Sequence, residues 1–236
     1  MYAFMEPWRL TTLIRLLQLA DSGFPTGGYA FSHGLEGLHA MGLMTNESDV
    51  SDFARTHLEE TLARQDLPAG YHAHRLAEVN DLPALIDLDR LLSALKPVPA
   101  FRNASTRIGR QTLESALPLY PSPFAHAFLE AVRRGESPGH HAVAFAVATF
   151  AAGIDAVSAV SAFGSSSLNG YVAAGVRLGI IGQGAAQRII ATLEPVLVDA
   201  LATAAMLDVQ DLGGYTPLID IAGMRQPSLA ARMFAS

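Results

Sequence analysis

The stretch VSDFARTHLEETLAR, residues 50–64, carries the pattern that decides the fold. One of its faces collects side chains that recur three and four residues apart, namely Val50, Phe53, His57, Leu58, Thr61 and Leu62. On the opposite face Arg55 precedes Glu59 by four residues. Glu60 and Arg64 repeat this spacing, and oppositely charged pairs placed in this way support a helix. The stretch therefore predicts an amphipathic α-helix with one buried face.

The same periodicity extends along the chain on both sides of this stretch. Further apolar stripes are Leu10, Leu13, Leu17 and Ala20; Leu85, Leu88, Leu92 and Leu95; Phe101, Ala104, Ile108 and Thr112; and Ile189, Ile190, Leu193, Leu197, Leu201 and Ala204. Proline and glycine clusters at 23–28, 118–123, 135–139 and 213–217 predict inter-helix loops. No run of alternating β-branched residues indicates a strand. We predict an all-α fold, one domain over residues 1–236, formed by a bundle of about eight to ten helices.

Composition excludes several classes of protein. Half of the 236 residues are hydrophobic and 16% are charged, which excludes a disordered chain. The net charge of −6 argues against nucleic-acid binding, because that function needs a basic surface. The chain has no cysteine and therefore no disulfide, thiol nucleophile or cysteine-based metal site.

The N-terminus shows no pattern of a signal peptide. The alanine-rich segment 142–163 is interrupted by Asp155, so it is expected to be a buried helix and not a membrane span. We expect a cytoplasmic protein that does not bind a membrane.

None of the motifs that carry enzyme chemistry is complete. Gly182-Gln183-Gly184 imitates a dinucleotide-binding loop, but Gln187 stands where the third glycine belongs. The sequence contains no Walker lysine motif and no Gly-x-Ser-x-Gly elbow. The carboxylates Asp87 and Asp89 fall on a face that is expected to be exposed to solvent. We therefore predict no catalytic residue.

The eight histidines do not form a chelating pattern. His72 and His74 lie two residues apart and His140 and His141 are adjacent, whereas two ligands on one helical face lie four residues apart. We predict no metal site and no bound cofactor, and we expect solvated or helix-capping histidines. A weak contact of His72 or His140 with nickel or zinc stays open.

Three motifs point to a known family. The first is LLQLADSGFPTGGYAFSHGLE, residues 16–36. The second consists of AGVRL at 174–178 followed by the glycine turn at 182–184 and AAQR at 185–188. The third is TPLIDIAGMR, residues 216–225, which continues to RMF at 232–234. In their order and spacing these motifs resemble the UreF family of urease accessory proteins over nearly the whole chain.

This resemblance implies a function in assembling the metal centre of urease. Members of the family are all-α, non-catalytic, chaperone-like proteins that form homodimers and bind the accessory protein UreD, also called UreH. That complex recruits the GTPase UreG, and the assembly delivers nickel to apo-urease. The resemblance thus implies that nickel and GTP are handled by the partner proteins.

The resemblance also implies partner-binding residues. Carried over position by position, they are Tyr29, Ser32, Glu36, Arg177, Gln183, Arg225, Arg232 and Phe234. We expect Glu36 and Arg177 on an exposed, partner-facing surface, because an arginine fork suits a carboxylate of a partner. The alternative for Arg177 is an internal salt bridge.

The C-terminal tail departs from the family pattern. Gln226-Pro227 replaces the common His-Glu pair, Ala235 replaces an arginine, and Ile180 stands where the family usually has proline. In the family this tail holds the UreD-type partner, so the replacements bear on that contact. Gly213-Gly214 permits a joint, so we expect the tail 213–236 to be mobile in the free protein and ordered on its partner.

Two other functions stay open at this point. An enzyme or a small-molecule-binding protein on the same scaffold would show a closed pocket with two or more convergent polar groups. A diverged member of the family would no longer serve urease.

Overall fold

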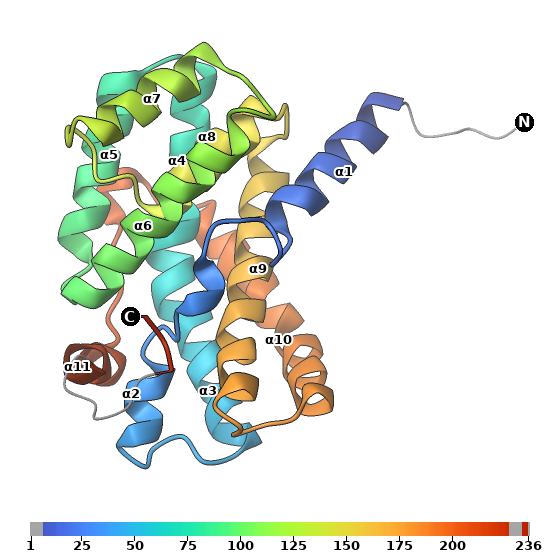
Figure 1. Ribbon diagram of the computed structural model, residues 1–236, viewed down its shortest axis with the longest axis vertical. Helices are drawn as coiled ribbons and strands as arrows, with labels where there is room; N and C mark the ends of the chain where they lie inside the picture. Colours follow the sequence, from blue (N-terminus) through green and yellow to red (C-terminus); the bar gives the residue numbers. More distant parts are fainter. Residues whose placement is uncertain (1–6, 227–232, 236) are drawn as a thin grey trace, which may run out of the picture.

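The computed structural model describes residues 7–226 and 233–235, and the regular structure among them is entirely helical (Figure 1). The α-helices are α1 (Pro7–Ala20), α2 (Leu35–Ala40), α3 (Glu47–Thr56), α4 (Leu67–Glu78), α5 (Leu82–Leu95), α6 (Pro99–Ala116), α7 (Pro123–Arg133), α8 (His141–Ala151), α9 (Ala156–Arg177), α10 (Gln183–Ala204) and α11 (Pro217–Arg225). A π-helix spans His57–Asp66, and short 3₁₀ turns span Gly28–Ala30 and Val209–Asp211. The predicted all-α class is confirmed.

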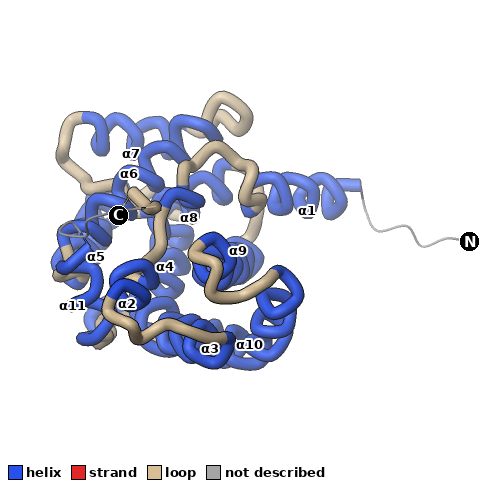
Figure 2. Tube along the Cα trace, turned by 60° about the horizontal axis from the view of Figure 1, so that its bottom comes forward, coloured by secondary structure: helices blue, strands red, loops and turns tan. Residues whose placement is uncertain are grey.

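The core is built around one long helical rod. Helix α3, the π-helix 57–66 and α4 follow one another without a break from residue 47 to residue 78. The rod packs against α8, α9 and α10, while α6 and α7 lie outside α8 and α5 (Figure 2). Leu58, Leu62 and Leu67 along the rod are fully buried. The helix predicted from residues 50–64 is therefore present, and its two charged pairs form on the outer face.

The predicted breaks between helices are also present. The proline and glycine clusters at 23–28, 118–123, 135–139 and 213–217 all fall between helices or at their first turns. The segment 142–163 differs from the prediction of a single helix. It is divided between α8 and α9, because the Asp155 side chain accepts a hydrogen bond from the Ser158 amide at 2.9 Å and so caps α9. Among the described residues no helix is long and apolar enough to cross a membrane.

The apolar stripe on the first helix lies mostly outside the bundle. Helix α1 extends away from the bundle, and its N-terminal end lies far from the other helices (Figures 1 and 2). Leu10, Leu13 and Leu17 are exposed, the last to 62%. Only the C-terminal end of α1 packs on the core, where Leu19 is buried and Arg15 donates to the Ala152 carbonyl at 2.9 Å. The helical period was therefore correct, but the stripe has no partner within this chain's described residues.

Candidate protein interface

The three sequence motifs meet at the end of α9. The guanidinium of Arg177, in the last turn of α9, lies 3.9 Å from the centre of the Tyr29 ring and 4.2 Å from that of Phe234. A cation between two aromatic faces is stabilised by their quadrupoles. The first motif, the second motif and the C-terminal segment therefore share one contact.

Backbone hydrogen bonds tie the same elements together. Arg177 donates to the Tyr29 carbonyl and, at 3.3 Å, to the Phe31 carbonyl. The Ala235 amide donates to the Ala30 carbonyl at 2.9 Å. Among the residues that the structure describes, Arg177 forms no ion pair with a carboxylate. The alternative of an internal salt bridge is therefore not what the structure shows.

Glu36 lies inside this cluster and not on the surface. It is 5% exposed, so the expectation of an exposed Glu36 is wrong. One carboxylate oxygen accepts the Met233 amide at 2.6 Å, and the other accepts the Gln226 side-chain amide at 2.7 Å. A buried carboxylate persists only where donors replace its lost hydration. The C-terminal segment supplies both donors, which explains why the charge is tolerated there.

Ser32, which the resemblance names, and Gln226 support this contact. Ser32 is buried, and its hydroxyl lies 3.4 Å from the Gln226 side-chain nitrogen. Gln226 itself is fully buried. Gln226 stands where the family commonly has histidine, and its side chain donates to Glu36. It therefore joins the C-terminal segment to α2.

Glycines let α11 approach α2 closely. A Cβ on Gly37 in α2 would lie 2.5 Å from the Ala222 carbonyl oxygen of α11. Gly34 has a φ of +96°, a left-handed conformation that favours glycine, and it also contacts Ile219. Gly34 belongs to the first motif and Gly37 directly follows it, and the residues that they approach belong to the third motif. The two motifs are thus complementary packing surfaces.

The remaining named residues are distributed differently. Gln183 begins α10 and is exposed, and its side chain makes no hydrogen bond or ion pair with a described residue. Arg225 ends α11 and is exposed. Arg232 lies outside the described residues. Tyr29 stacks on Arg177 with one face and remains 63% exposed.

An exposed apolar surface borders the cluster. Leu218, Ile221 and Met224 recur every three residues on α11 and are 50%, 47% and 54% exposed. Ile219, Ala222 and Gly223 of the same helix face the protein. Met233, one residue before the buried Phe234, is also exposed. A helix that is apolar on both sides is typical of a surface that another protein covers.

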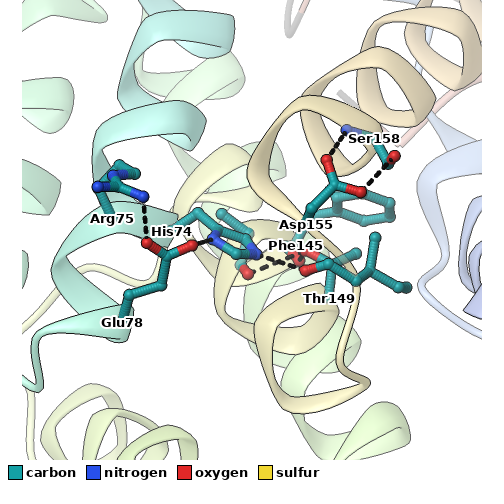
Figure 3. A network of polar contacts seen from close by, with 9 residues as sticks. His74, Arg75, Glu78, Phe145, Thr149, Asp155 and Ser158 are labelled. Atoms are coloured by element: carbon teal, nitrogen blue, oxygen red, sulfur yellow. Dashed lines mark hydrogen bonds and ion pairs between the residues drawn. The ribbon is translucent and has the colours of Figure 1, made fainter.

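His74, His140 and Asp89 depart from the expectation of solvent exposure. His74 and His140 are buried, and so is His57, which the predicted stripe had placed on a buried face. His74 lies 2.8 Å from the Ile154 carbonyl and 3.2 Å from Glu78. The contact of His74 with Glu78 can be followed in Figure 3. Asp89 is fully buried and accepts hydrogen bonds from the Ser137 hydroxyl and the Gly139 and His140 amides. No group of three or more histidine and acidic residues within the described chain is arranged to hold a metal ion.

A model of the UreF family matches residues 44–194, which is more than half of the chain. The chain belongs to the UreF family. Urease accessory proteins UreF from several bacteria match nearly the full length. That of Trichodesmium erythraeum (strain IMS101) is 31% identical over 223 residues, which cover 94% of this chain and 96% of the relative. That of Paenarthrobacter aurescens (strain TC1) is 31% identical over 226 residues, with 96% and 99% covered.

A third UreF protein, from Bacillus sp. (strain TB-90), is 29% identical over 227 residues, which cover 96% of this chain and all of the relative. The predicted UreF resemblance is therefore confirmed. UreF is a family of accessory proteins and not of enzymes. Within this UreF chain, the cluster of Arg177, Glu36 and the C-terminal segment is the place where its three motifs converge.

Proposed function

We propose that this chain is a non-catalytic scaffold for urease maturation. Together with a UreD/UreH-type partner it recruits a UreG-type GTPase, and the assembly delivers nickel to apo-urease. Nickel and GTP are handled by the partner proteins, so the chain itself needs no cofactor. The family gives the coarse function, and the cluster around Arg177 suggests where the partner acts.

The observation that carries this proposal is the position of α11. Its inner face packs on α2 and α6, and its outer face presents Leu218, Ile221 and Met224. The exposed Met233 and Tyr29 belong to the adjacent cluster. A partner that covers α11 would therefore also contact the segment whose backbone is held by Glu36. A scaffold needs a partner-binding surface that is held firmly by its own fold, and the contact of the tail with Glu36 would hold this surface.

The test is co-elution on a sizing column. The purified chain with its UreD-type partner should retain the GTPase, and Ile221→Asp should abolish this without lowering the melting temperature. Val79→Asp is the matched control, because Val79 is an exposed apolar residue at the C-terminal end of α4. If Ile221→Asp co-elutes as well as Val79→Asp, α11 is not the partner surface. If the unmodified chain fails to retain the GTPase, the scaffold function itself is wrong.

We also propose a homodimer, and helix α1 supplies a surface for it. Trp8, Leu13, Ile14 and Leu17 are exposed on a helix that leaves the bundle. Burying such side chains contributes about 1.5–3 kcal/mol each. Light scattering should show a dimer, and Ile14→Glu should convert it to a monomer. A dimer that survives this substitution would remove α1 from the homodimer interface.

A further inference from the structure

An internal cavity of about 110 Å³ lies beside the π-helix 57–66. Its polar lining comes from five separate elements and includes His33, His57, Asp66, Lys96, His141 and Tyr171. Phe31, Phe101 and Phe163 supply aromatic walls. A single water needs only about 10–15 Å³ of such volume, so the space suits several waters or one compact organic molecule. This is the pocket with convergent polar groups that the scaffold function does not require.

The chain after α10 closes one side of this cavity. The Gly213 amide donates to the Arg64 carbonyl at 3.0 Å, and the Gln65 side chain donates to the Gly214 carbonyl at 3.4 Å. A Cβ on Gly214 would lie 2.1 Å from the Glu60 carbonyl oxygen, so only glycine fits there. π-Helices occur frequently at functional sites because they redirect side chains that an α-helix would place elsewhere. Here the π-helix contributes His57 and Asp66 to one cavity.

Two polar groups at the cavity, on His57 and Tyr171, lack a hydrogen-bond partner among the described residues. The Nε2 atom of His57 lies 3.1 Å from the His33 carbonyl, which can only accept, so Nε2 carries the proton. The Nδ1 atom of His57 is then an acceptor, and it is buried without a partner in the described chain. The hydroxyl of the buried Tyr171, whose ring stacks on His57 at 4.4 Å, also makes no hydrogen bond to a described residue. Unpaired groups of this kind cost about 1–3 kcal/mol each unless water or a ligand satisfies them.

The positive charge at the cavity is already paired. The ammonium of Lys96 lies 2.9 Å and 3.1 Å from the two carboxylate oxygens of Asp66. Burial lowers the pKa of His33 to about 3 and the pKa values of His57 and His141 to about 4, so these rings are neutral at pH 7. Asp220 adds a carboxyl group to the lining, and burial raises the pKa of that group. The lining residues therefore offer donors and acceptors but no unpaired positive charge that would hold an anion.

We propose that this cavity binds a small uncharged molecule of the amide class, with an N–H group that donates to histidine and a carbonyl group that accepts from Tyr171. An amide supplies an N–H donor for the Nδ1 atom of His57 and a carbonyl acceptor for the hydroxyl of Tyr171. It also needs no counter-charge, which the paired Lys96 and Asp66 could not provide. This inference is independent of the scaffold function, because it concerns a different set of residues.

The probe set is acetamide with its anionic counterpart acetate, measured by ligand-observed NMR on the full chain. Acetamide should bind in the millimolar range, and acetate should bind at least tenfold more weakly. Tyr171→Phe keeps the ring stacking but removes the hydroxyl, so it should weaken acetamide binding about tenfold. Ser167→Leu should abolish binding, because Ser167 lines the cavity and a leucine would fill it.

Ser165→Leu is the matched control, because Ser165 lies on the same helix and is exposed. This control should bind acetamide normally. All three serine and tyrosine variants should retain partner capture on the sizing column, which separates this proposal from the scaffold function. The proposal is overturned if acetamide does not bind, if acetate binds equally well, or if binding survives in Ser167→Leu. If Ser167→Leu does not fold, Tyr171→Phe decides the question alone.

Discussion

Arg177 and Glu36 contact two adjacent residues of the C-terminal segment. Phe234 stacks on the guanidinium of Arg177, and the Met233 amide donates to Glu36. Two residues of the tail therefore contact a cation and an anion that lie far apart in the sequence. The Nε atom of Arg177 is buried and has no hydrogen-bond partner among the described residues. The guanidinium is therefore held by stacking between aromatic rings and by carbonyl groups more than by charge pairing.

Substitution of Glu36 by alanine should destabilise the protein. Its carboxylate satisfies two donors in a buried site, and leaving such donors unpaired costs about 1–3 kcal/mol each. We expect Glu36→Ala to lower the melting temperature by about 4–8 °C, given roughly 2 kcal/mol and the usual scaling for a chain of this size. Differential scanning calorimetry measures this. The control is Glu59→Ala, which breaks an exposed ion pair and should shift the melting temperature by less than about 2 °C. If Glu36→Ala and Glu59→Ala shift the melting temperature equally, Glu36 contributes no more than a surface charge.

The buried histidines should make stability depend on pH. Burial lowers the pKa of His57 to about 4 and that of His140 to about 3, from an ordinary value of 6.5. In the unfolded chain these histidines are protonated below about pH 6.5, whereas in the folded chain His57 is protonated only below about pH 4. The free energy of unfolding should therefore be at its full value above pH 6.5. Between pH 6.5 and about pH 4 it should fall by about 1.4 kcal/mol per pH unit for each such histidine.

Urea titrations at pH 7.5, 6.0 and 5.0 measure this effect. The unfolding midpoint should decrease steadily through the series. His126→Gln, which changes an exposed histidine on α7, should leave the slope unchanged. A midpoint that is constant between pH 7.5 and pH 5.0 would show that the buried rings are protonated in the folded state.

At the scale of elements, periodicity predicts which segments are helical but not what covers them. The stripes of residues 50–64 and of α10 are inward, as expected, whereas the equally regular stripe of α1 is exposed. The π-helix has no signature in the pattern, because His57, Leu58 and Leu62 satisfy an α-helical period equally well. The burial of Asp89 was also missed, since polar side chains are expected outside and its hydrogen-bond partners come from a distant segment.

Helix α11 depends on the absence of a side chain in α2. A methyl group on Gly37 would lie 2.5 Å from the Ala222 carbonyl oxygen, and backbone cannot move aside without shifting α11. Gly37→Ala should therefore destabilise the packing of α11 on α2 by about 1–3 kcal/mol. Hydrogen exchange should show faster exchange in residues 217–225, with the rod of α3 and α4 unchanged. Gly182→Ala, which meets nothing within 4 Å and has a negative φ, is the neutral control.

At the scale of the whole molecule, three short motifs that are separate in sequence form one site. The first motif, Arg177 and the tail were each identified from the sequence. Their contact could not be predicted, because the relative orientation of α2, α9 and α11 depends on packing. The predicted anchoring role of Phe234 takes a different form here, since Phe234 is buried against its own chain. The mobility of residues 213–236 in the free protein stays a prediction.

The tail should be separable from the bundle. Apart from α11, most of the core lies in helices that precede residue 205, and the buried residues among those described after Arg225 are Gln226 and Phe234. A chain ending at Arg225 should therefore keep its helical circular dichroism and a cooperative transition, with a modest loss of stability from exposing Glu36 and Arg177. It should no longer capture a UreD-type partner on a sizing column, because Met233 and the fixed end of the tail are gone. Phe234→Ala should weaken capture in the same direction while retaining the backbone, whereas Met206→Ala, at an exposed apolar residue after α10, should not. Full-strength capture by the truncated chain would assign partner binding to the outer face of α11 alone.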